Sequence, residues 1–266
     1  MAPDVRVRAG HSVTVSIVSH RHGEMVGNLV RQLLNFPLVE RILVTHNVVE
    51  EAHVPTDSRV TEIWNSVPIG FGENHNTAFK QCQSEYFCVL NPDIGFLEDP
   101  FPCLLETITS WDGAMVAPRI VNRNGQTEDS ARHFPTLSRI LAKLVGISDG
   151  RELRVFGDKP FCPQCVAGMF MLFKSQEFSA LRGFDAHYFL YYEDMDICVR
   201  LWKLKKRIVL DPRTPVIHDA QRQSHKSLRF LSWHLASMLR FLLRYQWRLP
   251  KVGPWSCSDP QKLDRS

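Results

Sequence analysis

The stretch YFCVLNPD at residues 86–93 places a short apolar run directly before an Asn-Pro-Asp turn. Such a run, bounded by turn residues, is typical of a buried strand in a parallel sheet. Upstream, VTVSIVS at residues 13–19 is β-branched and nearly all apolar, and residues 41–45 and 60–64 also have strand character. Residues 23–36 carry apolar side chains at helical spacing, and residues 74–82 read as a short helix. This alternation predicts an α/β fold with a mostly parallel central sheet flanked by helices.

Downstream of this region the pattern is less regular. Residues 114–118, 166–173 and 207–211 have strand character, while residues 194–203 and 227–247 have helical character. Residues 119–165 read as polar loop with one helical piece over 137–145. We therefore expect a main domain over residues 1–226, with halves at about 11–118 and about 119–226. A basic amphipathic helix and a tail are expected over residues 227–266.

The bulk composition excludes few classes of protein. The 266 residues suffice for one large α/β domain or two small ones, and 44% hydrophobic with 23% charged residues is ordinary for a globular chain. No stretch reaches 18 consecutive apolar residues, so the sequence predicts no membrane span. The N-terminus lacks an apolar signal segment, so a cytoplasmic chain with reduced cysteines is expected. Cys162 and Cys165 form a single CxxC without the further pair that zinc normally needs, and their role stays open.

Basic residues gather near the C-terminal end of the chain, where only two acids oppose them between Arg200 and Lys251. A surface of this kind suits anionic lipid headgroups, a pyrophosphate or nucleic acid. A solvated helix face is the alternative reading. No nucleic-acid recognition motif accompanies the charge, so we expect no nucleic-acid partner.

Asp93 follows the apolar strand over residues 86–90. Ligands of open parallel sheets bind beyond the carboxyl ends of strands, and a carboxylate there can hold a divalent cation that bridges a diphosphate. The alternative is that Asp93 only caps a turn or a helix.

Two further features carry chemistry. Glu193, Asp194 and Asp196 place three acids within four residues, where a carboxylate could accept a proton from a hydroxyl group, although acidic residues in the first turn of a helix are also a common capping pattern. His218 follows the β-like run at 215–217, and a neutral imidazole can bind Mn²⁺ or a similar ion, although a lone histidine is more often structural.

Taken in chain order, these features resemble the bacterial family 2 glycosyltransferases, in particular the rhamnosyltransferase-like branch that builds surface polysaccharides. The resemblance covers roughly residues 13–224 and rests on the following segments: PIGFGENHN at 68–76, LNPD at 90–93, Gly125 with Ser130, Arg132 and FPT at 134–136, VAGMFML at 166–172, GFD at 183–185, FLYYEDMD at 189–196, and VIH at 216–218. Two departures are visible. His46 stands where relatives commonly have an aspartate that reads the base, and Asn91 replaces the first acid of the Asp-x-Asp metal motif.

The resemblance implies a GT-A nucleotide-diphospho-sugar transferase fold and an inverting, metal-dependent reaction. It implies that Asp194 is the general base and that Glu193 orients the acceptor or the base. Asp93 and His218 would bind Mn²⁺ or Mg²⁺. The donor-binding residues would be Asn47, Gly70, Phe71, Asn74, Asn91 and Asp93. The residues that bind the acceptor or phosphate would be Arg132, Gly168, Met169, Tyr192 and Arg222, although Arg132 and Arg222 could equally serve surface solubility.

The same resemblance suggests the partners. Deoxythymidine-diphosphate rhamnose (dTDP-rhamnose) is the first choice of donor, a UDP-sugar is the next, and the acceptor would be a glycan or a polyprenyl-diphosphate-linked glycan. The helix over 227–247 could rest on the inner membrane, or it could be a core or dimer helix. The competing functions are a nucleotidyltransferase or metal-dependent hydrolase, and a catalytically silent nucleotide-sugar or glycan-binding module.

Overall fold

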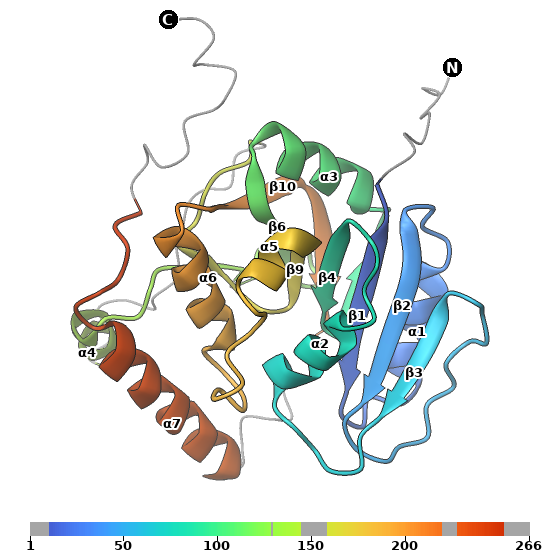
Figure 1. Cartoon of the computed structure of the whole chain (residues 1–266), viewed down its shortest axis with the longest axis horizontal. Coiled ribbons are helices and arrows are strands. Elements are labelled where there is room, and N and C mark those ends of the chain that lie inside the picture. The colour runs from blue at the N-terminus through green and yellow to red at the C-terminus, as the bar shows by residue number, and fades with distance from the viewer. Residues whose placement is uncertain (1–10, 129, 145–158, 220–227, 253–266) are drawn as a thin grey trace, which may run out of the picture.

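A computed structural model describes residues 11–128, 130–144, 159–219 and 228–252. Its centre is an eight-stranded sheet with the order β3-β2-β1-β4-β9-β6-β10-β5 (Figure 1). The pairs β1–β2, β1–β4, β2–β3 and β6–β10 are parallel, whereas β9 is antiparallel to β4 and β6, and β5 is antiparallel to β10. The predicted α/β fold with a mostly parallel sheet is confirmed.

The elements follow one another along the chain with short connections in the N-terminal half. The strands are β1 (Val13–Ser19), β2 (Val39–His46), β3 (Val60–Trp64), β4 (Tyr86–Leu90), β5 (Ile94–Phe96), β6 (Gly113–Val121), β7 (Ala131–Arg132), β8 (Cys165–Val166), β9 (Phe170–Lys174) and β10 (Arg207–His218). The helices are α1 (Glu24–Leu33), α2 (Phe71–Phe79), α3 (Phe101–Ser110), α4 (Leu137–Leu144), α5 (Ser175–Ala180), α6 (Glu193–Lys203) and α7 (Leu228–Tyr245).

The sheet separates two hydrophobic cores. On one face, α1 and α3 bury apolar side chains such as Leu29 and Leu104 against β1, β2 and β4. On the other face, α5 and α6 pack Phe178 and Leu201 against strands β4, β6, β9 and β10. The strands therefore read as continuous apolar runs because both of their faces are covered. Burial on this scale is the main favourable term in folding.

Most predicted elements are present, with some shifts. The strands at 13–19, 60–64 and 86–90 have the predicted bounds, but the helix predicted at 74–82 begins earlier, at Phe71. The strand predicted over 166–173 is divided into β8 and β9, because residues 167–169 leave the strand conformation. The strand predicted at 207–211 continues to His218 as β10.

The C-terminal helix α7 packs against the main body. Phe241 and Tyr245 are buried in the core on the α6 side of the sheet, and the Tyr245 hydroxyl donates a hydrogen bond to Asp196 over 2.7 Å. The basic amphipathic character that the sequence predicts is therefore combined with a firm attachment to α6 (Figure 1). Within the described residues, no helix has the length and apolar character needed to cross a membrane.

Among the cysteines that the structure describes, Cys162 differs from expectation. Cys162 is disulfide-bonded, so the prediction that all cysteines are reduced is wrong for this residue. The Cys165 thiol instead donates to the backbone carbonyl of Arg132 over 3.2 Å.

Candidate active site

The structure brings Asp93 and His218 into direct contact. Asp93 precedes β5, and His218 ends β10, where it pairs with Ile94 in the antiparallel register. The register places the two side chains at the same end of the sheet, with His218 Nε2 lying 3.1 Å from Asp93 Oδ2. The backbone N–H of Asp219 also donates to the Asp93 carbonyl over 2.8 Å. Two residues that lie 125 positions apart in the sequence thus form one polar pair.

Glu128 completes this group from the loop after β6. Its Oε2 lies 2.6 Å from His218 Nδ1. Burial opposes the charged imidazolium, but hydrogen bonds to Asp93 and Glu128 and the negative charges of both carboxylates outweigh it and raise the pKa of His218 to about 9. In this arrangement each ring nitrogen of His218 faces a carboxylate.

The pair fits a divalent cation. Asp93 Oδ1 is buried and has no hydrogen-bond partner, which leaves one carboxylate oxygen ready for a ligand. An oxygen from Asp93 and a nitrogen from His218 suit Mn²⁺, and Mg²⁺ would rely more on the oxygen. Among the residues that the structure describes, no group of three or more His, Cys, Asp or Glu side chains could hold a metal.

The acidic segment forms the start of α6. Tyr191 and Tyr192, immediately before the helix, both adopt left-handed backbone conformations with φ of 69°. Two successive non-glycine residues in this region are rare and strained, at roughly 1–3 kcal/mol each. The turn aims Asp194 at the end of the sheet, where its Oδ2 accepts the Gly168 N–H over 3.1 Å. Its Oδ1 accepts the N–H of Met195 over 2.8 Å.

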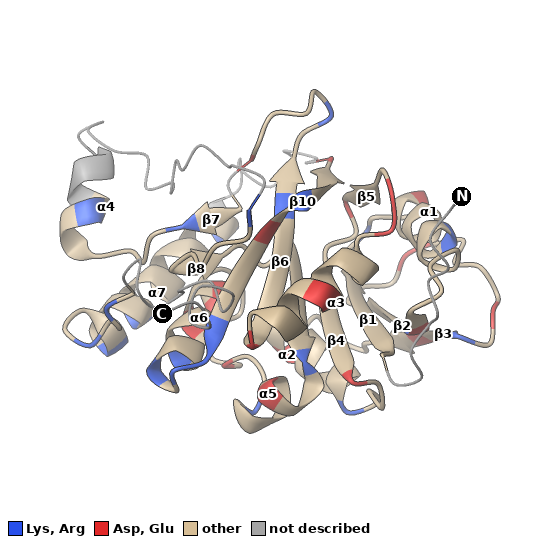
Figure 2. Cartoon of the chain, turned by 90° about the horizontal axis from the view of Figure 1, so that it is seen from above, with Lys and Arg blue, Asp and Glu red and all other residues tan. Residues whose placement is uncertain are grey.

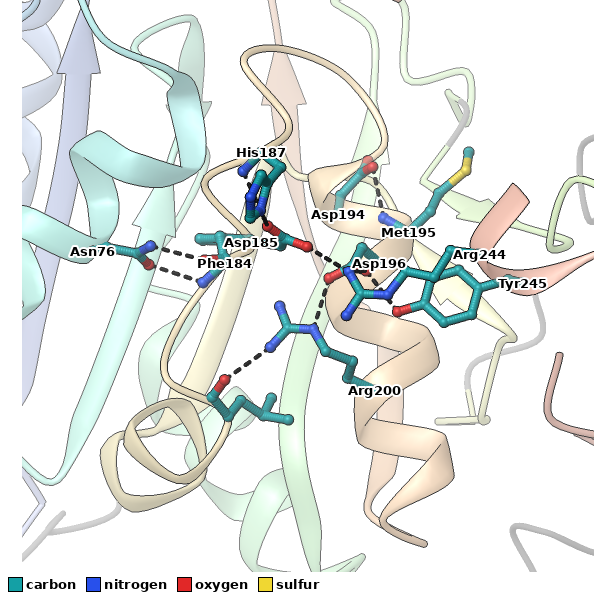
Figure 3. A network of polar contacts seen from close by, with 11 residues as sticks. Asn76, Phe184, Asp185, His187, Asp194, Met195, Asp196, Arg200, Arg244 and Tyr245 are labelled. Atoms are coloured by element: carbon teal, nitrogen blue, oxygen red, sulfur yellow. Dashed lines mark hydrogen bonds and ion pairs between the residues drawn. The ribbon is translucent and has the colours of Figure 1, made fainter. Parts of the chain in front are cut away.

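The three acids of this segment lie in different environments. Glu193 is buried, and burial together with the charge of Asp194 raises the pKa of its carboxyl well above the ordinary value. Asp196 is fully buried and bound by Arg200 at 2.6 Å and by Tyr245. Asp194 is the one of the three that is not buried. Figure 3 shows its side chain pointing away from the network around Asp196.

A short bridge links the two halves of the site. The Asn91 N–H, at the end of β4, donates to the Met169 carbonyl over 2.9 Å. The neighbouring residue Gly168 binds Asp194, and a Cβ atom at Gly168 would lie 3.4 Å from the Asp194 Cβ. Asp93 thus contacts His218, while Asn91 and Asp194 each form a backbone hydrogen bond to one of two adjacent residues, Met169 and Gly168.

The predicted donor-side asparagines have structural partners. Asn47 Oδ1 accepts hydrogen bonds from the Ile69 N–H and from the Asn65 amide, both over 2.9 Å. The Asn65 amide also donates to Asn74 Oδ1 over 2.7 Å, and the Asn74 amide donates to the Gly70 carbonyl. Asn47 and Asn74 thus fix the loop from residue 65 to residue 70, rather than presenting free amides.

Gly70 and Phe71 connect this loop to the acidic segment. The Phe71 N–H donates to the Phe189 carbonyl over 2.9 Å. A Cβ atom at Gly70 would lie 3.0 Å from that same carbonyl oxygen and 3.1 Å from the Phe189 Cα. Glycine is needed here because two backbones approach closely. The donor-side loop and the strained tyrosine turn are therefore held together.

The predicted acceptor-side residues are only partly described. Tyr192 is buried, and burial followed by the charge of Asp194 raises its pKa to about 12, against the opposing charge of Arg132. Arg132, at the end of β7, thus lies within electrostatic reach of the tyrosine turn. Arg222 lies outside the described residues.

Sequence reasoning missed two neighbours of the site, His22 and Glu128. His22 lies in the turn after β1. Burial lowers the pKa of His22, and the nearby charge of Asp93 partly opposes this. Its place beyond the carboxyl end of a parallel strand is the signal that could have found it. Glu128 carries no such signal. His46 is buried between Glu50 and Glu62 and stacks on Trp64 with ring centroids 3.9 Å apart, so its side chain is occupied within the fold.

Comparisons with known proteins identify the class of enzyme. No family model matches the chain. The chain is 30% identical over 191 residues to rhamnosyltransferase WbbL of Escherichia coli K12, which covers 66% of this chain and 70% of the relative. It is 27% identical over 187 residues to the N-acetylglucosaminyl-diphospho-decaprenol L-rhamnosyltransferase of Mycobacterium tuberculosis, which covers 62% of this chain and 56% of that relative.

A solved structure shows the same fold. The crystal structure of GalNAc-T7 with UDP, GalNAc and Mn²⁺ matches with a TM-score of 0.68 at 13% identity, over 89% of this chain and 48% of that chain. The fold is therefore of the GT-A type. The sequence relatives show that the chain belongs to the rhamnosyltransferase-like branch of the family 2 glycosyltransferases and is a hexosyltransferase-type enzyme.

Proposed function

We propose that this chain transfers rhamnose from a nucleoside diphosphate donor to a growing glycan or lipid-linked acceptor, with inversion at the anomeric carbon. The observation that carries the proposal is the Asp93–His218 pair, whose unpartnered buried oxygen lies at the carboxyl end of β4. Ligands of parallel α/β sheets bind at this edge. The adjacent residues Met169 and Gly168 bind Asn91, just after β4, and Asp194 through backbone hydrogen bonds.

Asp93 and His218 would hold the cation, with Mn²⁺ slightly favoured over Mg²⁺ because imidazole is one of the two ligands. GalNAc-T7, which shares the fold, was solved with Mn²⁺. When bound, such a cation offsets the charge that develops on a departing diphosphate. His218 must give up its proton to become a ligand, and Glu128 is placed to keep the ring oriented through Nδ1.

On the donor side, Asn47 and Asn74 act by fixing the loop that carries Gly70 and Phe71. Asn91 positions Asp93 by holding the end of β4 against Met169. We favour dTDP-rhamnose as the donor because the relatives are named rhamnosyltransferases, and a UDP-sugar is the second choice.

On the acceptor side, Asp194 is the proposed general base. It takes the proton of the acceptor hydroxyl, whose oxygen forms a bond to the anomeric carbon from the face opposite the diphosphate. The bond from that carbon to the diphosphate oxygen breaks, and its electron pair leaves with the nucleoside diphosphate. Glu193, whose carboxyl pKa is raised by burial, would orient the acceptor or the base by hydrogen bonding.

Arg132 and Tyr192 lie beside this position, and Arg132 would bind a phosphate of the acceptor or donor. Gly168 and Met169 form the backbone between the two halves. Because one relative is named for a decaprenol-linked substrate, we place the enzyme in the cytoplasm in peripheral contact with the inner membrane.

The deciding experiment measures release of free nucleoside diphosphate from dTDP-rhamnose with Mn²⁺, in the presence and absence of a short-chain N-acetylglucosaminyl-diphospho-polyprenol. A transferase releases the nucleotide only when donor and acceptor are both present. Equal release without acceptor would indicate a hydrolase. Binding without release across a panel of nucleotide sugars would indicate a silent binding module.

A further inference from the structure

Helix α7 is apolar on two opposite faces. Its inner face buries Ser237, Phe241 and Tyr245 against the main body. A second row of large apolar residues, spaced four apart, is exposed on the outer face. This outer row consists of Leu231 (54% exposed), Leu235 (48%), Leu239 (57%) and Leu243 (79%), and Trp247 (92%) continues the spacing in the turn just after the helix. Side chains four residues apart lie along one ridge of a helix, so the row forms a continuous strip. A contiguous exposed strip of this kind marks an interaction surface.

The inner face holds α7 in a fixed orientation relative to the catalytic segment. The Tyr245 hydroxyl donates to Asp196 over 2.7 Å, and Arg244 is paired with Asp185 (Figure 3). The Ser237 hydroxyl donates to the Leu190 carbonyl over 2.9 Å, one residue before the strained tyrosine turn. The outer row is therefore presented by a helix that is tied to the segment carrying Asp194.

The first turns of α7 lie beside the candidate active site. The Trp233 ring packs on Phe189 with centroids 4.7 Å apart, and His234 contacts the rings of Tyr191 and Tyr192 at 5.3 and 5.4 Å. Arg229 lies near His20, in the turn after β1. Burial and the charge of Arg21 lower the pKa of that histidine, and the charge of Arg229 lowers it further. A surface that docks against the outer row would therefore lie next to the acceptor side of the site.

The charge around α7 identifies the kind of surface. The helix contains no acidic residue. Arg229 and Arg240 are 11 residues apart, which is about three turns of a helix. The two arginines therefore lie on the same side of α7, along one flank of the outer row. Figure 2 shows Lys and Arg gathered at the end of the molecule that α6 and α7 occupy. A second copy docked on this strip would bring arginines against arginines, which is unfavourable, whereas an anionic surface complements them.

We propose that the outer row of α7 docks the enzyme on an anionic lipid bilayer, with the helix lying in the plane of the interface. An amphipathic helix with leucines and a tryptophan on one side and arginines at the border binds in this way. The inference deepens the proposed function, because it brings the tyrosine turn and Asp194 to the surface from which a lipid-linked acceptor would be presented.

The test is co-flotation of the full chain with vesicles of phosphatidylglycerol and phosphatidylcholine at low salt. We expect the wild type to float, and the double variant Leu235→Glu/Leu239→Glu to bind at least roughly 100-fold more weakly. Leu97→Glu is the matched control, because Leu97 is 70% exposed in the loop after β5, and it should bind as the wild type does. Circular dichroism and thermal unfolding establish that the variants are folded.

A second variant tests the charge separately. Arg229→Gln/Arg240→Gln should weaken binding by roughly fivefold per arginine on anionic vesicles and leave the residual binding to pure phosphatidylcholine unchanged. The proposal is overturned if the wild type fails to float at low salt, or if the leucine variant floats equally well. It is also overturned if the leucine variant only converts a dimer to a monomer without a change in flotation. Flotation requires no turnover, so its result stands whether or not the nucleotide-release assay supports the transferase.

Discussion

Replacing Asp194 with asparagine tests the proposed chemistry most directly. Asparagine keeps the shape of the side chain but cannot accept a proton at neutral pH. A general base contributes about 10²–10⁴ to the rate, so kcat should fall by that factor, which corresponds to about 3–5 kcal/mol in the barrier. Donor affinity should change little, because Asp194 is not among the residues that would hold the diphosphate. Calorimetry and initial-rate measurements on the same preparation give both quantities.

Structural damage could also lower the kcat of this variant, and the hydrogen bonds of Asp194 set how large that effect can be. Asp194 accepts two backbone hydrogen bonds, from Gly168 at 3.1 Å and from Met195 at 2.8 Å. Asparagine has a single acceptor oxygen, so one of these bonds is lost, at about 1–3 kcal/mol when a charged partner is removed. That loss would appear as lower thermal stability. If Asp194→Asn keeps its thermal stability but loses most of its kcat, then Asp194 acts as the base and not only as a structural acid.

Asp185→Asn is the matched control, since Asp185 lies in the same connection and binds Arg244 and His187 away from Asp194 (Figure 3). It should keep kcat within about threefold of wild type while losing about 1 kcal/mol of stability. If the folded Asp194 variant retained kcat within tenfold of the wild type, or if Asp185→Asn lost as much activity, the base assignment would have to be abandoned.

Asp93→Ala should weaken Mn²⁺-dependent donor binding by at least roughly tenfold, and equal calorimetric affinity with and without metal in the wild type would remove Asp93 from the ligand set. Acid should destabilise the fold through His75, whose pKa burial lowers from 6.5 to about 3. Below about pH 6.5 the unfolded chain binds a proton there and the folded chain does not, so the contribution of His75 to the free energy of unfolding should be about 2 kcal/mol lower at pH 5 than at pH 7. Urea titrations of His75→Asn should lack this difference. Gly72→Ala should destabilise α2 by about 1–2 kcal/mol despite the higher helix propensity of alanine, because the new Cβ would lie 2.6 Å from the Phe184 Cβ. A more stable variant in thermal unfolding would contradict that packing argument.

Most of the strands could be predicted from the sequence, because short β-branched apolar runs between turn residues favour a strand over a helix. β1, β3 and β4 have the predicted bounds, and the placement of Asp93 after β4 followed from them. Helix α3 was not predicted, although Phe101, Leu104, Leu105 and Ile108 have helical spacing and Pro102 stands in its first turn. That omission was avoidable, since the signal lies within ten residues.

Other features depend on tertiary contacts that no local pattern contains. The break at residues 167–169 exists because Gly168 turns to meet Asp194 and Met169 turns to hold Asn91. Both partners lie outside the local window, one 26 residues along the chain and the other directly after β4. The pairing of His218 with Asp93 likewise arises from the antiparallel register of β5 on β10. Sequence reasoning can name such residues, but only packing decides which of them meet.

The tyrosine turn connects these observations. Tyr191 and Tyr192 hold left-handed backbone conformations that the fold must stabilise from elsewhere, and the contacts that do so are visible around them. Phe189 binds the donor-side loop through Phe71, Leu190 accepts a hydrogen bond from Ser237 of α7, and Asp196 holds Tyr245. The strained turn is thus tied to the donor-side loop and to the helix that we propose docks on the membrane.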